Sequence, residues 1–122
     1  MTGYMRIFIL TGLVLMIGTF QVSAQGVQFF ESLQDIPLMP GLTEHTGDTL
    51  FYDKPSGRVV ESVADMGGFS DETVADYYLS ALPQFGWKNT GPNTFSRGDE
   101  SLELAFEADE GGNLLRVLVQ PR

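Results

Sequence analysis

The chain has 122 residues, 16 of them acidic and seven basic, with a formal net charge of −9 at pH 7. These residues suffice for one domain with its own core and are too few for two. A surface of this charge repels nucleic acid phosphates and anionic membranes, so we expect neither as a partner. The chain has no cysteine, which excludes disulfides and thiolate metal sites.

The N-terminus has the three parts of an export signal. Arg6 precedes an apolar run over residues 7–20, and residues 22–24 supply the small side chains of a cleavage site. The run is shorter than the ~20 residues of a membrane-spanning helix, which favours cleavage over anchoring. We predict a signal peptide over residues 1–24, cleavage after Ala24, and a periplasmic mature protein that is not inserted in the membrane. An uncleaved anchor is the alternative.

Residues 25–48 have no clean period of two or 3.6, yet they hold too many apolar residues for a free tail. Pro37 and Pro40 favour extended backbone for themselves and for the residues before them. We therefore predict an extended N-terminal strap over residues 25–48, with one helical turn near residues 29–33. The Pro-x-x-Pro spacing also fits a ligand for an aromatic groove on another protein, which is an alternative.

Residues 49–66 predict a β-hairpin. The β-rich residues 49–52 precede a cluster of turn residues at 53–57, and residues 58–66 follow with an imperfect alternation of apolar and polar side chains. Gly67 and Gly68 then lead the chain out of the hairpin.

Residues 70–82 predict the central helix. Ser70 can cap its N-terminus, and Asp71 and Glu72 place negative charge in the first turn. Pro83 should end the regular helix near Leu82. Apolar residues recur on one helical face, at the positions Val74, Tyr77, Tyr78, Ala81, Leu82 and Phe85.

Beyond Trp87 the pattern predicts four strands, at residues 87–89, 94–97, 101–108 and 114–120, separated by turns. The last of them is apolar at nearly every position, as expected of a strand with neighbours on both sides. We therefore predict an α+β domain over residues 49–122, with one main helix packed on an antiparallel sheet of about five strands, in the order β-β-α-β-β-β-β. The strap should cover part of the sheet that the helix leaves bare.

The sequence shows no catalytic constellation. His45, the only histidine, lies in a polar loop without the spacing of a catalytic triad, and one histidine without cysteine makes a zinc site unexpected. The acidic residues around Glu103 and Asp109 lack the spacing of a calcium-binding loop. We predict a protein that is not an enzyme and has no metal or cofactor. A hydrolase with two converging carboxylates stays open, because sequence spacing does not report convergence in space.

Three segments carry a resemblance: DIPLMPGL at residues 35–42, FYDKPSGRVVE at residues 51–61 and ADYYLSALPQFGW at residues 75–87. Together with the strands that follow, they resemble the small exported proteins of Gram-negative bacteria, most closely uncharacterised alphaproteobacterial ones. The resemblance spans most of the mature chain. It implies a periplasmic location and a helix-on-sheet fold, and it brings no activity, cofactor or catalytic residue.

We expect a binding or accessory module that contacts another protein or an envelope component. The expected contact residues lie in the strap and around the helix, at Phe29, Phe30, Met39, Tyr77, Tyr78 and Trp87. The alternative is a carrier of a small apolar ligand, which requires a closed cavity of at least ~300 Å³ between helix and sheet, lined by aromatic residues. The identity of the partner and the oligomeric state do not follow from the sequence.

Overall fold

The computed structural model describes residues 26–122. The predicted signal peptide and its cleavage site lie outside the described residues. Within residues 26–122, no helix has the length and apolar character needed to cross a membrane.

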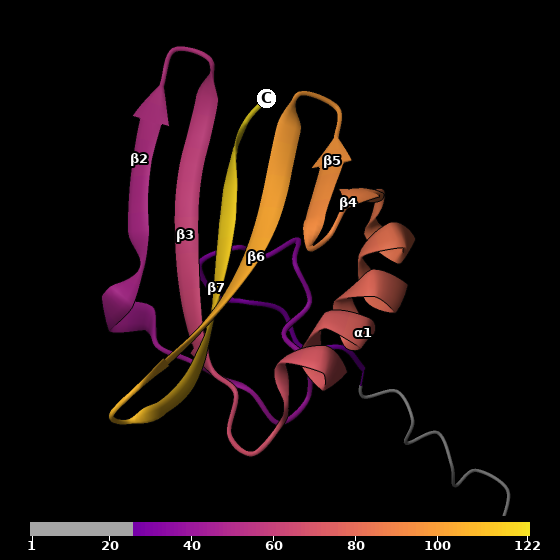
Figure 1. Ribbon diagram of the computed structural model, residues 1–122. Coiled ribbons are helices and arrows are strands. Elements are labelled where there is room, and N and C mark those ends of the chain that lie inside the picture. Colours follow the sequence, from indigo (N-terminus) through magenta and orange to yellow (C-terminus); the bar gives the residue numbers. More distant parts are fainter. Residues whose placement is uncertain (1–25) are drawn as a thin grey trace, which may run out of the picture.

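The described residues form one antiparallel sheet of seven strands and one α-helix (Figure 1). The strand order is β1-β3-β7-β6-β5-β4, and β2 pairs with β3 beside β1. The helix α1 spans Asp71–Ala81, and two short 3-10 helices, η2 and η3, span Thr46–Asp48 and Leu82–Phe85. The strands are β1 (Thr43–Glu44), β2 (Leu50–Lys54), β3 (Gly57–Asp65), β4 (Lys88–Gly91), β5 (Thr94–Arg97), β6 (Glu100–Asp109) and β7 (Gly112–Pro121).

The α+β class is confirmed, whereas the predicted strand number and order are wrong. The sheet has seven strands instead of about five, and three strands precede the helix instead of two. The strand missed by the sequence is β1, which has two residues and so cannot show a period. It exists because Thr43 and Glu44 pair with Asp65 and Ala64 at the end of β3.

The ends of the helix follow the local signals in the sequence. The Ser70 hydroxyl accepts a hydrogen bond from the Thr73 N–H at 3.1 Å, which satisfies one of the unpaired donors of the first turn. At the other end, α1 tightens into η3, which contains Pro83. Gly86 has a φ of 91°, a left-handed conformation that glycine adopts without a Cβ clash, and the chain turns there into β4.

The strand β7 lies between β3 and β6, as the apolar character of its sequence predicts. Leu115, Val117 and Val119 point into the core, on the inner face of the sheet. On the outer face, the Arg116 guanidinium lies between two carboxylates, at 3.3 Å from Glu61 and 2.8 Å from Glu107. The inner face of β7 therefore contacts the apolar core, whereas its outer face carries a group of charged side chains.

The N-terminal strap is part of the core, and its predicted extended form is wrong. It folds back on itself instead of running extended: the Phe30 N–H bonds to the Ile36 carbonyl, and the Leu38 N–H to that of Gln28. It packs on the inner face beside α1, where its side chains contact those of β3 and β7 next to the helix. Its buried side chains share one cluster with α1, β3 and β7, and they are Phe30, Leu33, Ile36, Leu38, Met39 and Leu42.

One side chain joins the strap to the helix. The buried Tyr78 hydroxyl donates to the Pro37 carbonyl at 2.7 Å and accepts from the Met39 N–H at 3.1 Å. Burial raises the pKa of Tyr78 above its ordinary value of 10, so the phenol stays neutral and keeps its proton for this bond. The strap and α1 are therefore held in a fixed relation.

Candidate functional site

Four of the six expected contact residues belong to the core. Phe30, Met39, Tyr78 and Trp87 are buried, so they hold the domain together and offer no surface to a partner. The other two reach solvent: Phe29 is 39% exposed and Tyr77 is partly buried. These two residues, one from the strap and one from α1, locate the candidate site.

Phe29 and Tyr77 lie at the C-terminal end of α1, next to an open depression of about 410 Å³ that we call the helix-end groove. The Phe29 ring packs edge-on against Phe85, with ring centroids 5.5 Å apart. Phe85 and Tyr77 both line the groove. The complete lining is Val27, Tyr77, Ser80, Ala81, Gln84 and Phe85.

The groove has an apolar floor and three side chains with uncharged polar groups, those of Tyr77, Ser80 and Gln84. Partial burial raises the pKa of Tyr77 above its ordinary value of 10, so this phenol is neutral at physiological pH. The Gln84 side-chain amide donates a hydrogen bond to the Ser80 carbonyl at 3.2 Å, and this bond links η3 to α1. An uncharged concavity of this kind can take an apolar or aromatic group and lacks the ionised groups that acid–base catalysis uses.

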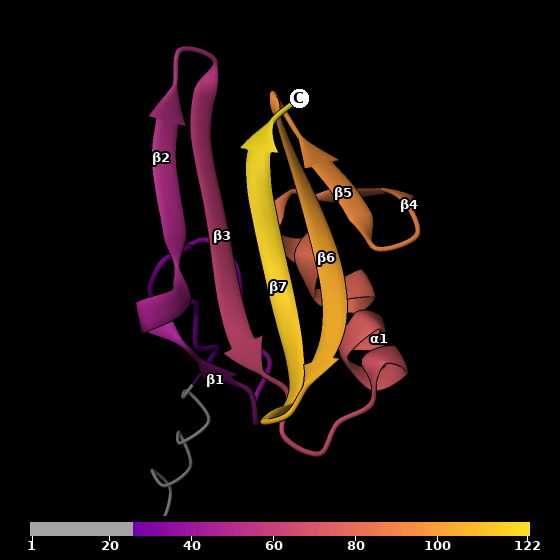
Figure 2. The ribbon, with the colours of Figure 1, turned by 60° about the vertical axis from the view of Figure 1, so that its left-hand side comes forward.

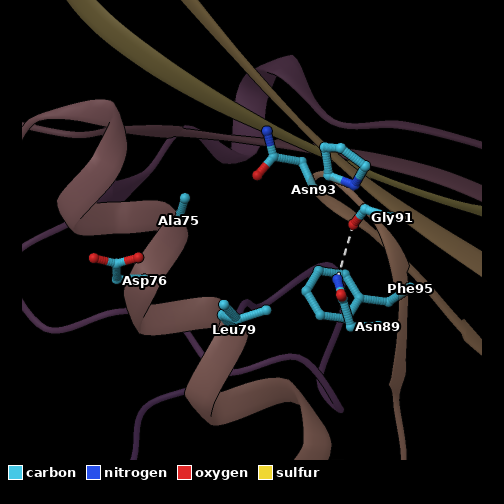
Figure 3. A pocket seen from close by; sticks show the side chains of 8 residues that line it. Ala75, Asp76, Leu79, Asn89, Gly91, Asn93 and Phe95 are labelled. Atoms are coloured by element: carbon cyan, nitrogen blue, oxygen red, sulfur yellow. Dashed lines mark hydrogen bonds between the residues drawn. The ribbon is translucent and has the colours of Figure 1, made fainter.

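A second depression lies between α1 and the β4–β5 hairpin (Figure 3). Its volume is about 240 Å³, below the ~300 Å³ of a usual small-ligand site. The Asn89 side-chain amide donates to the carbonyls of Gly91 and Thr94, at 2.9 and 3.1 Å, and so holds the hairpin turn. Neither depression is the closed aromatic cavity that the carrier hypothesis requires, since Tyr78 and Trp87 are themselves core side chains.

Two arginines and two carboxylates form a charged cluster between the strap and the sheet. The Asp35 carboxylate lies 2.5 Å from Arg97 and 3.3 Å from Arg58, and Arg58 lies 2.7 Å from Glu100. The Arg97 guanidinium also lies over the Trp87 ring, 4.3 Å from its centroid. Because each carboxylate pairs with at least one guanidinium group, Asp35 through its Oδ2 atom, the cluster attaches the strap to the sheet.

Replacing Asp35 by asparagine should lower the free energy of unfolding by about 1 kcal/mol at pH 7, since more than a third of the side chain is exposed and solvent screens it. Partial burial alone would raise the pKa of Asp35, but the hydrogen bond from Arg97 and the charge of Arg58 outweigh it and lower the pKa below 3.8. The stabilisation is then complete above about pH 5 and is lost as the pH falls through 3.8 and below.

Urea unfolding at a series of pH values measures this effect. The wild-type chain should lose more stability between about pH 5 and pH 3 than the Asp35→Asn chain does. Gln34→Ala changes the exposed neighbour, leaves the carboxylate in place and should keep the wild-type profile. Parallel pH profiles for wild type and Asp35→Asn would contradict the assignment.

The remaining polar groups of residues 26–122 make local contacts. The His45 Nδ1 atom lies 3.7 Å from the Asp48 carboxylate, on the surface. Within residues 26–122, no group of three or more histidine, aspartate or glutamate side chains could hold a metal ion. The buried Ser62 hydroxyl bonds to Ser32 at 2.5 Å, and Ser32 donates to Glu44 at 2.6 Å. This chain of hydrogen bonds fastens the strap to β1 and β3.

Sequence reasoning missed a second apolar surface, on β2. Leu50, Phe51 and Tyr52 are consecutive and all exposed, and none of them was among the expected contact residues. A signal was present: three large apolar residues in succession break the alternation of a half-buried strand, immediately before a turn. A run of apolar residues is typical of a buried strand, so the run itself does not predict exposure. Only the sheet topology shows that β2 is an edge strand.

The structure defines an α+β domain with one helix on an antiparallel sheet and an open apolar groove at the end of that helix. Comparisons of the chain with protein-family models, curated proteins and solved structures gave no match.

Proposed function

We propose that the mature domain is a non-enzymatic binding module of the periplasm, which contacts another protein of the cell envelope through the helix-end groove. The observation that carries this proposal is the open apolar groove of about 410 Å³, in which Tyr77 and Phe85 stay accessible at the surface of an otherwise well-packed domain. Aromatic side chains in such positions are typical of the anchoring sites of protein interfaces.

The open shape of the groove favours a protein partner over a small molecule. Small-ligand sites bury 70–90% or more of a ligand, whereas an open groove leaves one side of its occupant in solvent. A side chain that projects from another protein fits this geometry, because its backbone remains outside. Ser80 and Gln84 can then meet the polar atoms around the inserted group.

Charge indicates the chemistry of the partner. The chain has a net charge of −9, and Asp71, Glu72 and Asp76 are exposed on α1. The last turn of α1 contains no basic residue that would offset the negative end of the helix dipole. We therefore expect an apolar anchor flanked by lysine or arginine, whose association slows as the ionic strength rises.

A carrier of a small apolar ligand remains the second candidate. The volume of the groove lies within the range of known ligand sites, which favours a carrier, whereas its open shape differs from the closed cavity expected of one. The periplasmic location in both proposals rests on the signal-like N-terminus and on the resemblance to exported proteins.

Photo-crosslinking in the living cell tests the proposal. A photoreactive amino acid at Gln84, inside the groove, should capture one envelope protein, whereas the same group at Leu79, exposed on α1 and outside the groove, should not. The captured protein, once purified, should bind the domain at least ~10-fold more weakly after Tyr77→Ala and unchanged after Leu79→Ala.

The result that would overturn the protein-partner proposal is equal capture at both positions, or no loss of affinity with Tyr77→Ala in a variant shown to be folded. A small molecule that is released from the purified domain on unfolding, detected by native mass spectrometry, would instead support the carrier.

A further inference from the structure

β2 is an edge strand with a free outer side. Leu50–Lys54 pairs with β3 through successive residues without a register shift, and it pairs with no other strand of the described residues. It lies at the end of the sheet remote from α1, so the helix does not cover it (Figures 1 and 2). In an edge strand, alternate backbone N–H and C=O groups point away from the sheet and can bond to an added strand.

The side chains of β2 are as exposed as its backbone. The exposed fractions of Leu50, Phe51 and Tyr52 are 55, 58 and 50%. Because successive side chains of a strand alternate, these three residues place apolar surface on both faces of the sheet edge. Single exposed apolar residues are normal on a protein surface, but three in succession on a free edge form a surface suited to strand addition.

The opposite edge of the same sheet is protected. β4, spanning Lys88–Gly91, is short and polar, and its pairing with β5 shifts in register between Asn89 and Gly91. Short, polar and irregular strands are the usual protection of a sheet edge against association. The addition of a further strand is therefore hindered at the β4 edge and possible at the β2 edge.

We propose that β2 pairs antiparallel with β2 of a second copy of this chain, about a two-fold axis at Phe51, so that the two sheets become one. This interface is separate from the helix-end groove, and the proposal does not depend on the proposed function. Two-fold symmetry brings the same strand of two copies together in antiparallel orientation, as sheet extension requires.

The sequence of β2 complements itself in this register. Each Leu50 lies opposite Tyr52 of the second copy, and the two Phe51 side chains lie opposite each other. Asp53 and Lys54 lie beyond the paired residues of β2, because the positions opposite them fall before the start of that strand, and Asp48 belongs to η2. Apolar pairs across strands are stabilising. An axis at Tyr52 would place Phe51 opposite Asp53 and Leu50 opposite Lys54, which pairs apolar side chains with charged ones.

The overall charge limits the strength of this dimer. Each copy has a net charge of −9, so the two copies repel each other at long range, although Asp53 and Lys54 balance within the strand itself. Salt screens this repulsion beyond about 8–10 Å at physiological ionic strength. One pair of short strands is a small interface, and we expect a dissociation constant on the order of 10–100 µM.

Disulfide trapping tests the register, because the chain has no cysteine of its own. The protein is purified from the periplasm of an expressing bacterium. With the axis at Phe51, the two copies of a Phe51→Cys variant bring their Cα atoms to about 4.5–5.5 Å, within reach of a disulfide. Two copies of Asp53→Cys are offset by four positions, more than ~13 Å apart and out of reach.

Mild oxidation should thus link Phe51→Cys into dimers at least ~10-fold faster than it links Asp53→Cys. The same ratio should hold against Leu79→Cys, a control at an exposed position away from the edge that reports random collisions. Sedimentation equilibrium should show a concentration-dependent dimer for the unmodified chain. Phe51→Lys should abolish that dimer, because an edge lysine blocks strand pairing, while Leu79→Lys should leave it intact.

Three results would overturn the proposal: a monomer at all concentrations up to about 1 mM, a dimer that survives Phe51→Lys, or linking of Asp53→Cys as fast as that of Phe51→Cys. Capture of a different protein at Phe51→Cys, without a homodimer, would also overturn it.

If Phe51→Lys did not fold, the rates of disulfide formation would still decide whether β2 pairs with β2 in this register. Loss of partner capture at Gln84 would leave this dimer untouched, so the two proposals fail separately.

Discussion

Replacing Trp87 by alanine should lower the free energy of unfolding by about 3–5 kcal/mol. The indole is 2% exposed and lies in the cluster that joins the strap, α1 and the sheet. The variant would leave a cavity there and would remove the ring on which the Arg97 guanidinium stacks. Because small domains have a total stability of about 5–15 kcal/mol, this single change should bring the domain close to unfolding.

Urea unfolding followed by circular dichroism measures the loss, since the variant lacks the only tryptophan. Trp87→Phe keeps an aromatic ring in the same place and should cost clearly less than Trp87→Ala. Lys88→Ala, at the exposed next position, should stay within about 0.5 kcal/mol of wild type. A Trp87→Ala variant as stable as the lysine control would mean that the indole does not belong to the core.

Deleting residues 25–42 should abolish cooperative folding. The deleted segment supplies six buried apolar side chains to the core, and it holds the two backbone groups that bond to the Tyr78 hydroxyl. Without it, the apolar faces of α1 and of β7 would be open to water, and the chain should aggregate or bind hydrophobic dyes. The absence of a cooperative thermal transition in circular dichroism would show this result.

Two single substitutions separate a structural strap from a removable tail. Leu33→Ala truncates a fully buried side chain and should cost about 2–5 kcal/mol, whereas Gln34→Ala at the exposed next position should be nearly neutral. If the deleted chain melted at the wild-type temperature, the strap would be a tail that binds a partner, and the core described here would be wrong.

The sequence predicts α1 well because the signals for a helix are local. Ser70 caps the first turn, Pro83 and Gly86 end the helix, and each of these residues acts on backbone only a few positions away. The alternation along β6 and the apolar run of β7 are also local patterns, and both strands form where they were expected.

The candidate site was predictable only in part. Aromatic residues at helical spacing favoured the α1 face, but the pattern does not distinguish a core ring from a surface one. Tyr77 and Tyr78 are neighbours in the sequence, yet Tyr78 is buried under the strap while Tyr77 lines the helix-end groove. The difference depends on where residues 37–39 lie, which the sequence near the tyrosines does not encode.

By itself, the sequence determined the α+β class, the position of the helix, the strands with a clear period and the absence of disulfides. Only the tertiary structure decided the pairing of β1, the folded form of the strap, the free edge at β2, and which aromatic side chains reach solvent. The physical reason is the range of the interactions. Caps and periods act within a few residues, whereas the bonds between Ser32 and Ser62, Asp35 and Arg97, and Met39 and Tyr78 join positions 30 to 62 residues apart.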